Sequence, residues 1–192
     1  MQVQKLVLDV TDVTHHEAVA RLDELALALA DMRVRNVDIG NGTCDEDSDA
    51  FALALRCVPS SCVTLRVDTA AMSVSSWSYL DPRRLSCLRV LEATHISPSD
   101  AAVIGETFAI GGPREPLSKL KLCFSNSQYV LMDAAIAGVL TVTGLTRNLE
   151  VECDDVFSDG EEDAHERGPP KFLMASRMAA ERGVNFRFKV YQ

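Results

Sequence analysis

Long apolar runs are absent from this 192-residue chain. The longest, residues 129–145, contains Asp133 and falls short of the roughly 20 apolar residues that a membrane-spanning helix needs. The first ten residues, MQVQKLVLDV, also lack the charged-then-apolar layout of a secretory signal. We therefore expect no membrane segment, and a cytoplasmic or nuclear protein.

Basic residues are few. The chain has 19 Lys and Arg against 28 Asp and Glu, which gives a formal net charge of −9. Proteins that bind nucleic acid through its phosphates rely on clustered cations. The charge balance therefore argues against a nucleic-acid partner.

The common motifs of catalysis and cofactor binding are missing as well. The sequence has no glycine-rich phosphate loop, no zinc-type Cys/His spacing and no paired catalytic carboxylates on a shared element. Its six cysteines form no CxxC pair, and most are flanked by apolar residues, which is typical of buried reduced thiols. We predict a protein that is not an enzyme and holds no metal or cofactor.

A repeat runs through most of the chain. The segments VQKLVL, VRNVDI, CVTLRV, LRVLEA, LSKLKL and TRNLEV place apolar residues at their first, fourth and sixth positions, with Thr146 the one polar exception. Their fourth positions follow one another at steps of 31, 28, 26, 29 and 29 residues, and are Leu6, Val37, Leu65, Leu91, Leu120 and Leu149. A step of this size indicates a chain built from repeated structural units.

This pattern resembles the leucine-rich-repeat family of the ribonuclease-inhibitor-like class, whose unit is LxxLxLxxNxL followed by a helix. The resemblance implies an α/β solenoid, or horseshoe, with a parallel concave sheet of about six to seven strands and outer helices. At the family's asparagine position this chain has Thr11, Gly42, Ala70, Ile96, Ser125 and Asp154. The turn after each strand must therefore satisfy its backbone groups in another way.

Helical periodicity follows most of the predicted strands. We predict helices over 15–32, 48–58 and 127–142, and one that begins at Ser97-Pro98 and ends at Gly111-Gly112-Pro113. Asp81-Pro82 interrupts the unit at 70–87, which predicts a turn or 3₁₀ segment there. We interpret 1–192 as a single domain: six degenerate repeats over 1–156, an acidic surface loop over 157–170, and a capping helix and strand over 171–192.

Alternation along the strands leaves the third, fifth and seventh positions of each repeat on the concave sheet surface. The fifth positions alternate in sign from Asp38 to Glu150, and the seventh carry three acids and no base. Such columns form a self-neutralising ladder or a recognition surface, and the acidic seventh column suits a basic or polar partner. We predict that a protein partner binds this face through Asp38, Arg66, Asp68, Glu92, Lys119, Lys121, Glu150 and Glu152.

Three other clusters have simpler interpretations. An EF-hand-like series fits calcium-loop positions 1, 5, 6, 9 and 12, but Phe157 replaces a ligand and a strand precedes the loop, so we expect a solvated acidic loop. Two histidines at a helix start point in different directions, and a thiol and an imidazole near strand ends have no orienting third group. These clusters are Asp155, Asp159, Gly160, Asp163 and Glu166; His15 and His16; and His95 and Cys123.

The C-terminal segment FLMASRMAAERGVNFRFKV, residues 172–190, is similar to the ends of leucine-rich-repeat regions in fungal F-box-type proteins. That resemblance implies the substrate-recognition part of a ubiquitin ligase receptor. The alternative is an inhibitor or GTPase-regulator type of repeat protein that clamps one enzyme. A third, an enzyme that uses His95 and Cys123 or the acidic loop, would lose activity on mutation of His95. The oligomeric state stays open.

Overall fold

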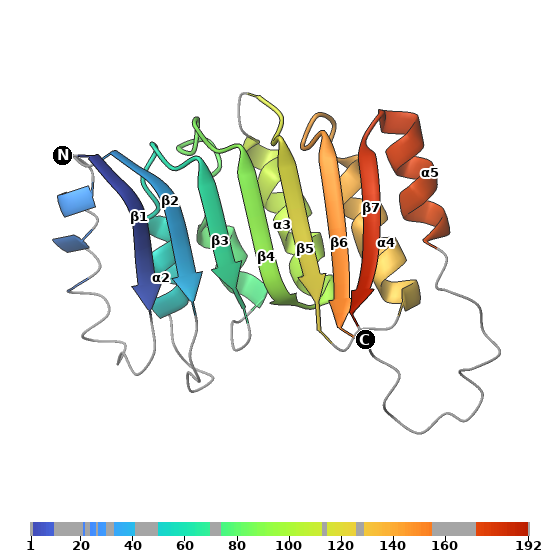
Figure 1. Cartoon of the computed structure of the whole chain (residues 1–192), viewed down its shortest axis with the longest axis horizontal. Coiled ribbons are helices and arrows are strands. Elements are labelled where there is room, and N and C mark those ends of the chain that lie inside the picture. The colour runs from blue at the N-terminus through green and yellow to red at the C-terminus, as the bar shows by residue number, and fades with distance from the viewer. Residues whose placement is uncertain are drawn as a thin grey trace, which may run out of the picture.

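Seven parallel strands form one sheet, and their order across the sheet is their order along the chain. The computed structural model in Figure 1 describes residues 2–9, 21, 24–25, 27–29, 33–40, 50–69, 74–112, 115–125, 129–154 and 172–191. The strands are β1 (Gln2–Asp9), β2 (Arg33–Gly40), β3 (Thr64–Asp68), β4 (Val90–Ile96), β5 (Lys119–Phe124), β6 (Asn148–Asp154) and β7 (Asn185–Tyr191).

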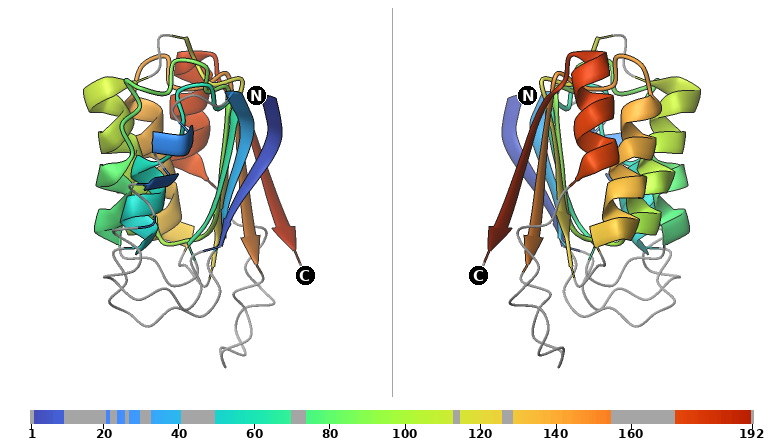
Figure 2. Two further views of the ribbon diagram at one scale, coloured as in Figure 1. Left: turned by 90° about the vertical axis from the view of Figure 1, so that its left-hand side faces the viewer. Right: turned by 90° about the vertical axis from the view of Figure 1, so that its right-hand side faces the viewer.

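The helices cover one face of this sheet, as both views of Figure 2 show. They are α2 (Ala50–Arg56), the 3₁₀ helix η1 (Val74–Tyr79), α3 (Pro98–Gly111), α4 (Tyr129–Thr141) and α5 (Leu173–Arg182). The predicted α/β class with a parallel sheet of about six to seven strands is confirmed. None of the helices in the described part of the chain is long and apolar enough to cross a membrane.

The strand register is the one that the repeat predicts. The fourth positions pair side by side from β1 to β6, and Phe186 of β7 continues the row beside Leu149. Most of this row is completely buried under the helices. Thr146, the polar exception, is buried at the first position, where its hydroxyl donates to the Asn148 carbonyl at 2.9 Å. Its burial is tolerated because that hydroxyl is hydrogen-bonded.

Local capping explains where the central helix begins. Ser97 accepts a hydrogen bond from the Asp100 backbone N–H, and the Asp100 carboxylate accepts one from the Ser97 N–H, a reciprocal capping box. Pro98 occupies the first turn, where its missing N–H costs nothing. Further along, Gly105 brings α3 against α4, since a Cβ there would lie 3.3 Å from the Val139 Cα.

The last helix is capped by a side chain from its neighbour. The buried Asp133 of α4 accepts hydrogen bonds from the backbone N–H groups of Met174 and Ala175, at 3.0 and 2.8 Å. Those are N–H groups of the first turn of α5, which have no partner within the helix. The helix ends at Gly183, whose φ of 66° is the left-handed cap that glycine adopts without strain.

The remaining predicted elements have mixed outcomes. The break at 70–87 contains the 3₁₀ helix η1, as predicted, and its Trp77 is the largest fully buried side chain. Of the predicted helix at 15–32, the six described residues are helical, and the rest lie outside the described residues. The predicted acidic loop at 157–170 also lies outside them. The proposed domain boundaries stay a prediction.

Candidate protein-binding face

No described element covers the sheet face opposite the helices, which we call the open face (Figure 2). It carries the third, fifth and seventh positions of each repeat. The structure places all the predicted binding residues on strands β2 to β6 of this face. Charged side chains there engage one another in a nearly continuous chain of ion pairs.

The first part of this chain follows the predicted column. Arg66 lies between two acids in register with it, Asp38 on β2 and Glu92 on β4, at 3.8 and 2.8 Å. Because β1 has Val7 in this column, Asp38 takes its second partner from the third position, where Lys5 approaches to 2.7 Å. The alternation of charge therefore pairs these neighbours as the sequence predicts.

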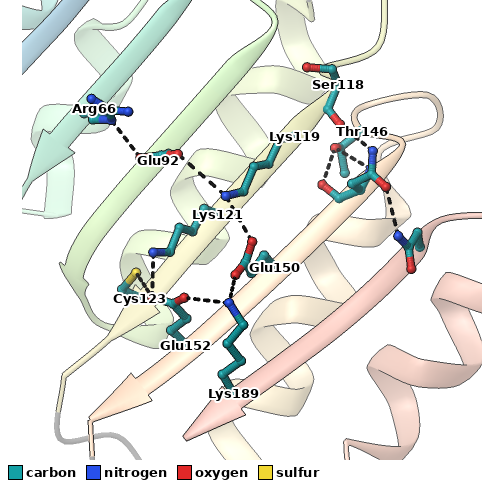
Figure 3. Close-up of polar contacts among 12 residues, drawn as sticks. Arg66, Glu92, Ser118, Lys119, Lys121, Cys123, Thr146, Glu150, Glu152 and Lys189 are labelled. Atoms are coloured by element: carbon teal, nitrogen blue, oxygen red, sulfur yellow. Dashed lines mark hydrogen bonds and ion pairs between the residues drawn. The ribbon is translucent and has the colours of Figure 1, made fainter. Parts of the chain in front are cut away.

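The second part departs from the column, as Figure 3 shows. Lys121 is in register with Glu92 and Glu150 but pairs instead with Glu152, at 2.6 Å. Lys119 bridges Glu92 and Glu150, at 3.7 and 3.0 Å. Both lysines lean toward the carboxyl end of the sheet, so each reaches an acid two positions further on, which a long flexible side chain can do.

Glu152 is the centre of the tightest cluster. Its carboxylate is approached by Lys121, by Lys189 of β7 at 3.5 Å, and by the Cys123 thiol at 3.4 Å (Figure 3). Its side chain is only 8% exposed. A carboxylate this deeply buried is tolerated because cations and a donor surround it.

Several acids of the open face are more buried than the bases that pair with them. Glu150 and Glu92 are 17% and 20% exposed, whereas Lys5, Arg66 and Lys189 are 54%, 52% and 51% exposed. Lys119 and Lys121, at 35% and 22%, are more buried than these three, and Asp68 is 37% exposed. Long Lys and Arg side chains can lay their apolar stems along a surface and keep their charged ends in water. The most accessible of these ion-paired side chains are therefore cationic, although the chain as a whole is acidic.

Ionisation follows from these contacts. Hydrogen bonds from Lys189 and Lys119 lower the pKa of Glu150 to about 2. Burial, opposed by Lys121 and reinforced by the hydrogen bond to Glu152, raises the pKa of the Cys123 thiol to about 12. Cys123 is therefore a neutral thiol at physiological pH, which makes it a poor nucleophile.

A bulge interrupts the face at the end of β4. The register shifts between Ala93 and Ile96, and His95 has φ of 57°, in the left-handed region that few non-glycine residues adopt. The His95 imidazole Nδ1 contacts the Asp68 carboxylate at 2.7 Å. The Thr69 hydroxyl lies 2.9 Å from the Thr94 carbonyl and 3.0 Å from that of His95. The last residue of β3, Asp68, and Thr69 directly after it therefore hold the bulge in place.

The bulge separates the two residues considered for thiol–imidazole chemistry. His95 turns to Asp68 and Cys123 turns to Glu152, and no hydrogen bond joins the two in the described structure. His15, His16 and the EF-hand-like segment lie outside the described residues. Among the described residues, no group of three or more His, Cys, Asp or Glu side chains could hold a metal ion.

Three asparagines at third positions also make hydrogen bonds toward the preceding strand. Asn148 donates to the Ser118 carbonyl at 2.6 Å, Asn185 donates to Asn148 at 3.0 Å, and Asn36 donates to the Gln4 carbonyl at 2.9 Å. These amides tie β2 to β1, β6 to the residue just before β5, and β7 to β6. They are not the asparagines of the family consensus, which follow the strands.

Some residues of the face were missed in the sequence. Lys189 belongs to the atypical last strand, and counting the fifth and seventh columns on to residues 187 and 189 would have included it. The bulge has a sequence signal as well. Leu91 is in register with Leu120, and Ile96 with Phe124. Ser97, the residue after Ile96, is six residues after Leu91, whereas Ser125, the residue after Phe124, is only five after Leu120. Strand β4 therefore has one extra residue, which forms the bulge.

Comparison with known proteins adds no assignment. The chain matches no protein-family model, no curated protein and no solved structure.

Proposed function

We propose that this chain is a leucine-rich-repeat solenoid of the ribonuclease-inhibitor-like class, and that its open, concave sheet face binds another protein. Supporting the class are the consecutive strand order and the in-register row of apolar fourth positions, one per repeat. In solenoids each unit contacts only its neighbours, and the stacked strands form an extended binding surface.

The observation that carries the proposal is the uncovered face itself. All-parallel sheets are as a rule covered on both faces, and their strands are then apolar throughout. Here the strands alternate, and the uncovered face bears the ion-pair chain from Lys5 to Lys189. A polar, ordered surface seven strands wide suits recognition of a protein.

Exposure indicates which chemistry the partner brings. Among the ion-paired side chains of the open face, Lys5, Arg66 and Lys189 are the most exposed. Glu152, on which the expectation of a basic partner partly rested, is buried among cations. We therefore favour a partner that offers carboxylates or backbone carbonyls to the charged tips of the three exposed side chains, with Asp68 and His95 at the rim.

A photo-crosslinking experiment tests this proposal. A benzoyl-phenylalanine at Thr64, a half-buried third-position residue of β3, is compared with one at Ala102, exposed on α3. When it is incubated with lysate of its source cells and irradiated, the protein with the crosslinker at Thr64 should give a discrete adduct. This adduct should disappear when the same protein also carries Arg66→Gln. Adducts from Ala102 alone would contradict it.

The adduct also separates the two forms of this function. Several ubiquitinated proteins cross-linked at Thr64 would fit the receptor of a ubiquitin ligase, which is the form of the function that the F-box resemblance favours. One abundant enzyme whose activity falls on binding would fit the clamping inhibitor or regulator.

A further inference from the structure

Strand β7 is the last strand of the sheet and pairs with β6 alone among the described strands. The Asn185 N–H donates to the Arg147 carbonyl at 2.9 Å, which fixes the side to which that residue's backbone points. Because backbone groups of a parallel strand alternate between its two neighbours, the N–H and carbonyl of Phe186 point to the outer edge. The edge therefore has the form that accepts a further strand.

One cation of the open face stands apart from the ion-pair chain. Among charged side chains described in the third, fifth and seventh columns, Arg187 is the one without an ion pair. It is in register with Glu150, but that carboxylate is held by Lys119 and Lys189. The exposed Arg187 guanidinium can therefore form an ion pair with an acidic side chain of a strand added at the outer edge of β7.

The apolar side of β7 is also incompletely covered. Phe186 and Phe188 point toward the helix layer, are half-buried, and pack on Phe172 with ring centroids 6.2 and 4.3 Å away. An added strand with apolar residues on that side would bury more of both rings. The three residues Phe186, Arg187 and Phe188 therefore match an added strand with the sequence apolar–acidic–apolar. Its acidic residue would lie beside Arg187, and its two apolar residues beside the phenylalanines.

A second copy of this chain does not match that pattern. Two β7 edges paired antiparallel would bring Arg187 and Lys189 of one copy against those of the other, and like charges across a sheet are destabilising. Continuing the sheet with β1 of another copy would place Val7, not an acid, opposite Arg187. Neither edge of this chain completes the column.

We propose that the outer edge of β7 takes up an extended segment of another protein, parallel to β7, with an acidic residue between two apolar ones. The acidic carboxylate pairs with Arg187, and the backbone N–H of that residue donates to the Phe186 carbonyl. Its apolar neighbours lie over Phe186 and Phe188. Arg187 belongs to the open face, but the pairing edge is the outer edge of β7, and strand addition there does not depend on what binds the open face.

Fluorescence anisotropy with labelled eleven-residue peptides tests the proposal on the full chain. One peptide has a central Val-Glu-Val and its counterpart Val-Lys-Val. The wild-type protein should bind the Glu peptide at least fivefold more tightly, and Arg187→Glu should reverse the preference. Arg33→Glu, an exposed arginine on β2, is the matched control and should leave the preference unchanged.

Backbone methylation tests the pairing itself. An N-methyl group on the central Glu removes the donor that faces Phe186 and should abolish binding, while an N-methyl group on either Val should leave it intact. Equal affinity for the Glu and Lys peptides overturns the proposal, as does loss of binding only on methylation of a Val. Sedimentation that shows self-association of the chain, without any peptide binding, overturns it in favour of a second copy.

Discussion

On the helix-covered face of the sheet, neighbours in register are residues of one kind, whereas on the open face they are matched by charge and reach. Leu91, Leu120 and Leu149 lie side by side and buried. On the other face Lys121 bypasses both acids in register with it and pairs with Glu152. The first arrangement depends on strand register alone. The second depends also on side-chain length and direction.

The largest effect should come from breaking the covered face. Leu120→Ala removes a side chain with no exposure from the central row and leaves a cavity, which should lower the free energy of unfolding by about 3 kcal/mol. Urea denaturation followed by circular dichroism measures it. Thr64→Ala, at the third position of β3, is the matched change on the open face and should stay within about 0.5 kcal/mol. Equal losses would mean that the two faces do not differ in this way.

A smaller effect on stability is expected at the buried cluster around Glu152 on the open face. Glu152→Lys adds a third cation beside Lys121 and Lys189 in a site only 8% exposed, and should cost about 2 to 3 kcal/mol of unfolding free energy. Asp68→Lys reverses an acid that is 37% exposed, and should cost less than about 1 kcal/mol. Comparable urea midpoints for the two variants would contradict the burial of this cluster.

The third effect depends on pH. The Glu150 pKa is about 2 in the folded chain because Lys189 and Lys119 hydrogen-bond its carboxylate, against an ordinary value of 4.5. A lowered pKa stabilises the folded state fully above the ordinary value, and this contribution is lost as pH falls toward 2. The stability difference between wild type and Glu150→Gln should therefore be constant near neutrality and shrink below about pH 5. Thermal unfolding of both proteins from pH 7 to pH 3 measures the difference, and a gap that widens in acid would be inconsistent with these contacts.

The covered face could be predicted from the sequence because one signal specifies it. Apolar residues at positions one, four and six recur with a nearly constant step, and that step determines both the strands and their register. The Ser97-Pro98 helix start was predictable for the same reason, since its capping depends on residues close in sequence. Asp133 was not, because it caps a helix that begins 40 residues later in the chain.

The open face could be predicted only in part. Charge alternation indicated the pairs of Arg66, but not the diagonal pairs of Lys119 and Lys121, because the direction of a lysine is decided by its surroundings and not by its position. The acidity of the seventh column was visible in the sequence. The burial of Glu152 was not, since Lys189, one of the two lysines that pair with it, comes from the atypical last strand.

The most direct test of binding to the open face uses the partner protein that cross-links at Thr64. Its affinity is measured for this chain carrying the double substitution Lys5→Gln/Arg66→Gln. These substitutions neutralise two exposed tips without adding a like charge, and folding is checked by circular dichroism. The control is Arg56→Gln, an exposed change at the end of α2 on the helix side. We predict at least tenfold weaker binding for the double variant and unchanged binding for Arg56→Gln. Full affinity in the double variant, with binding weakened by Arg56→Gln, would contradict recognition through the open face.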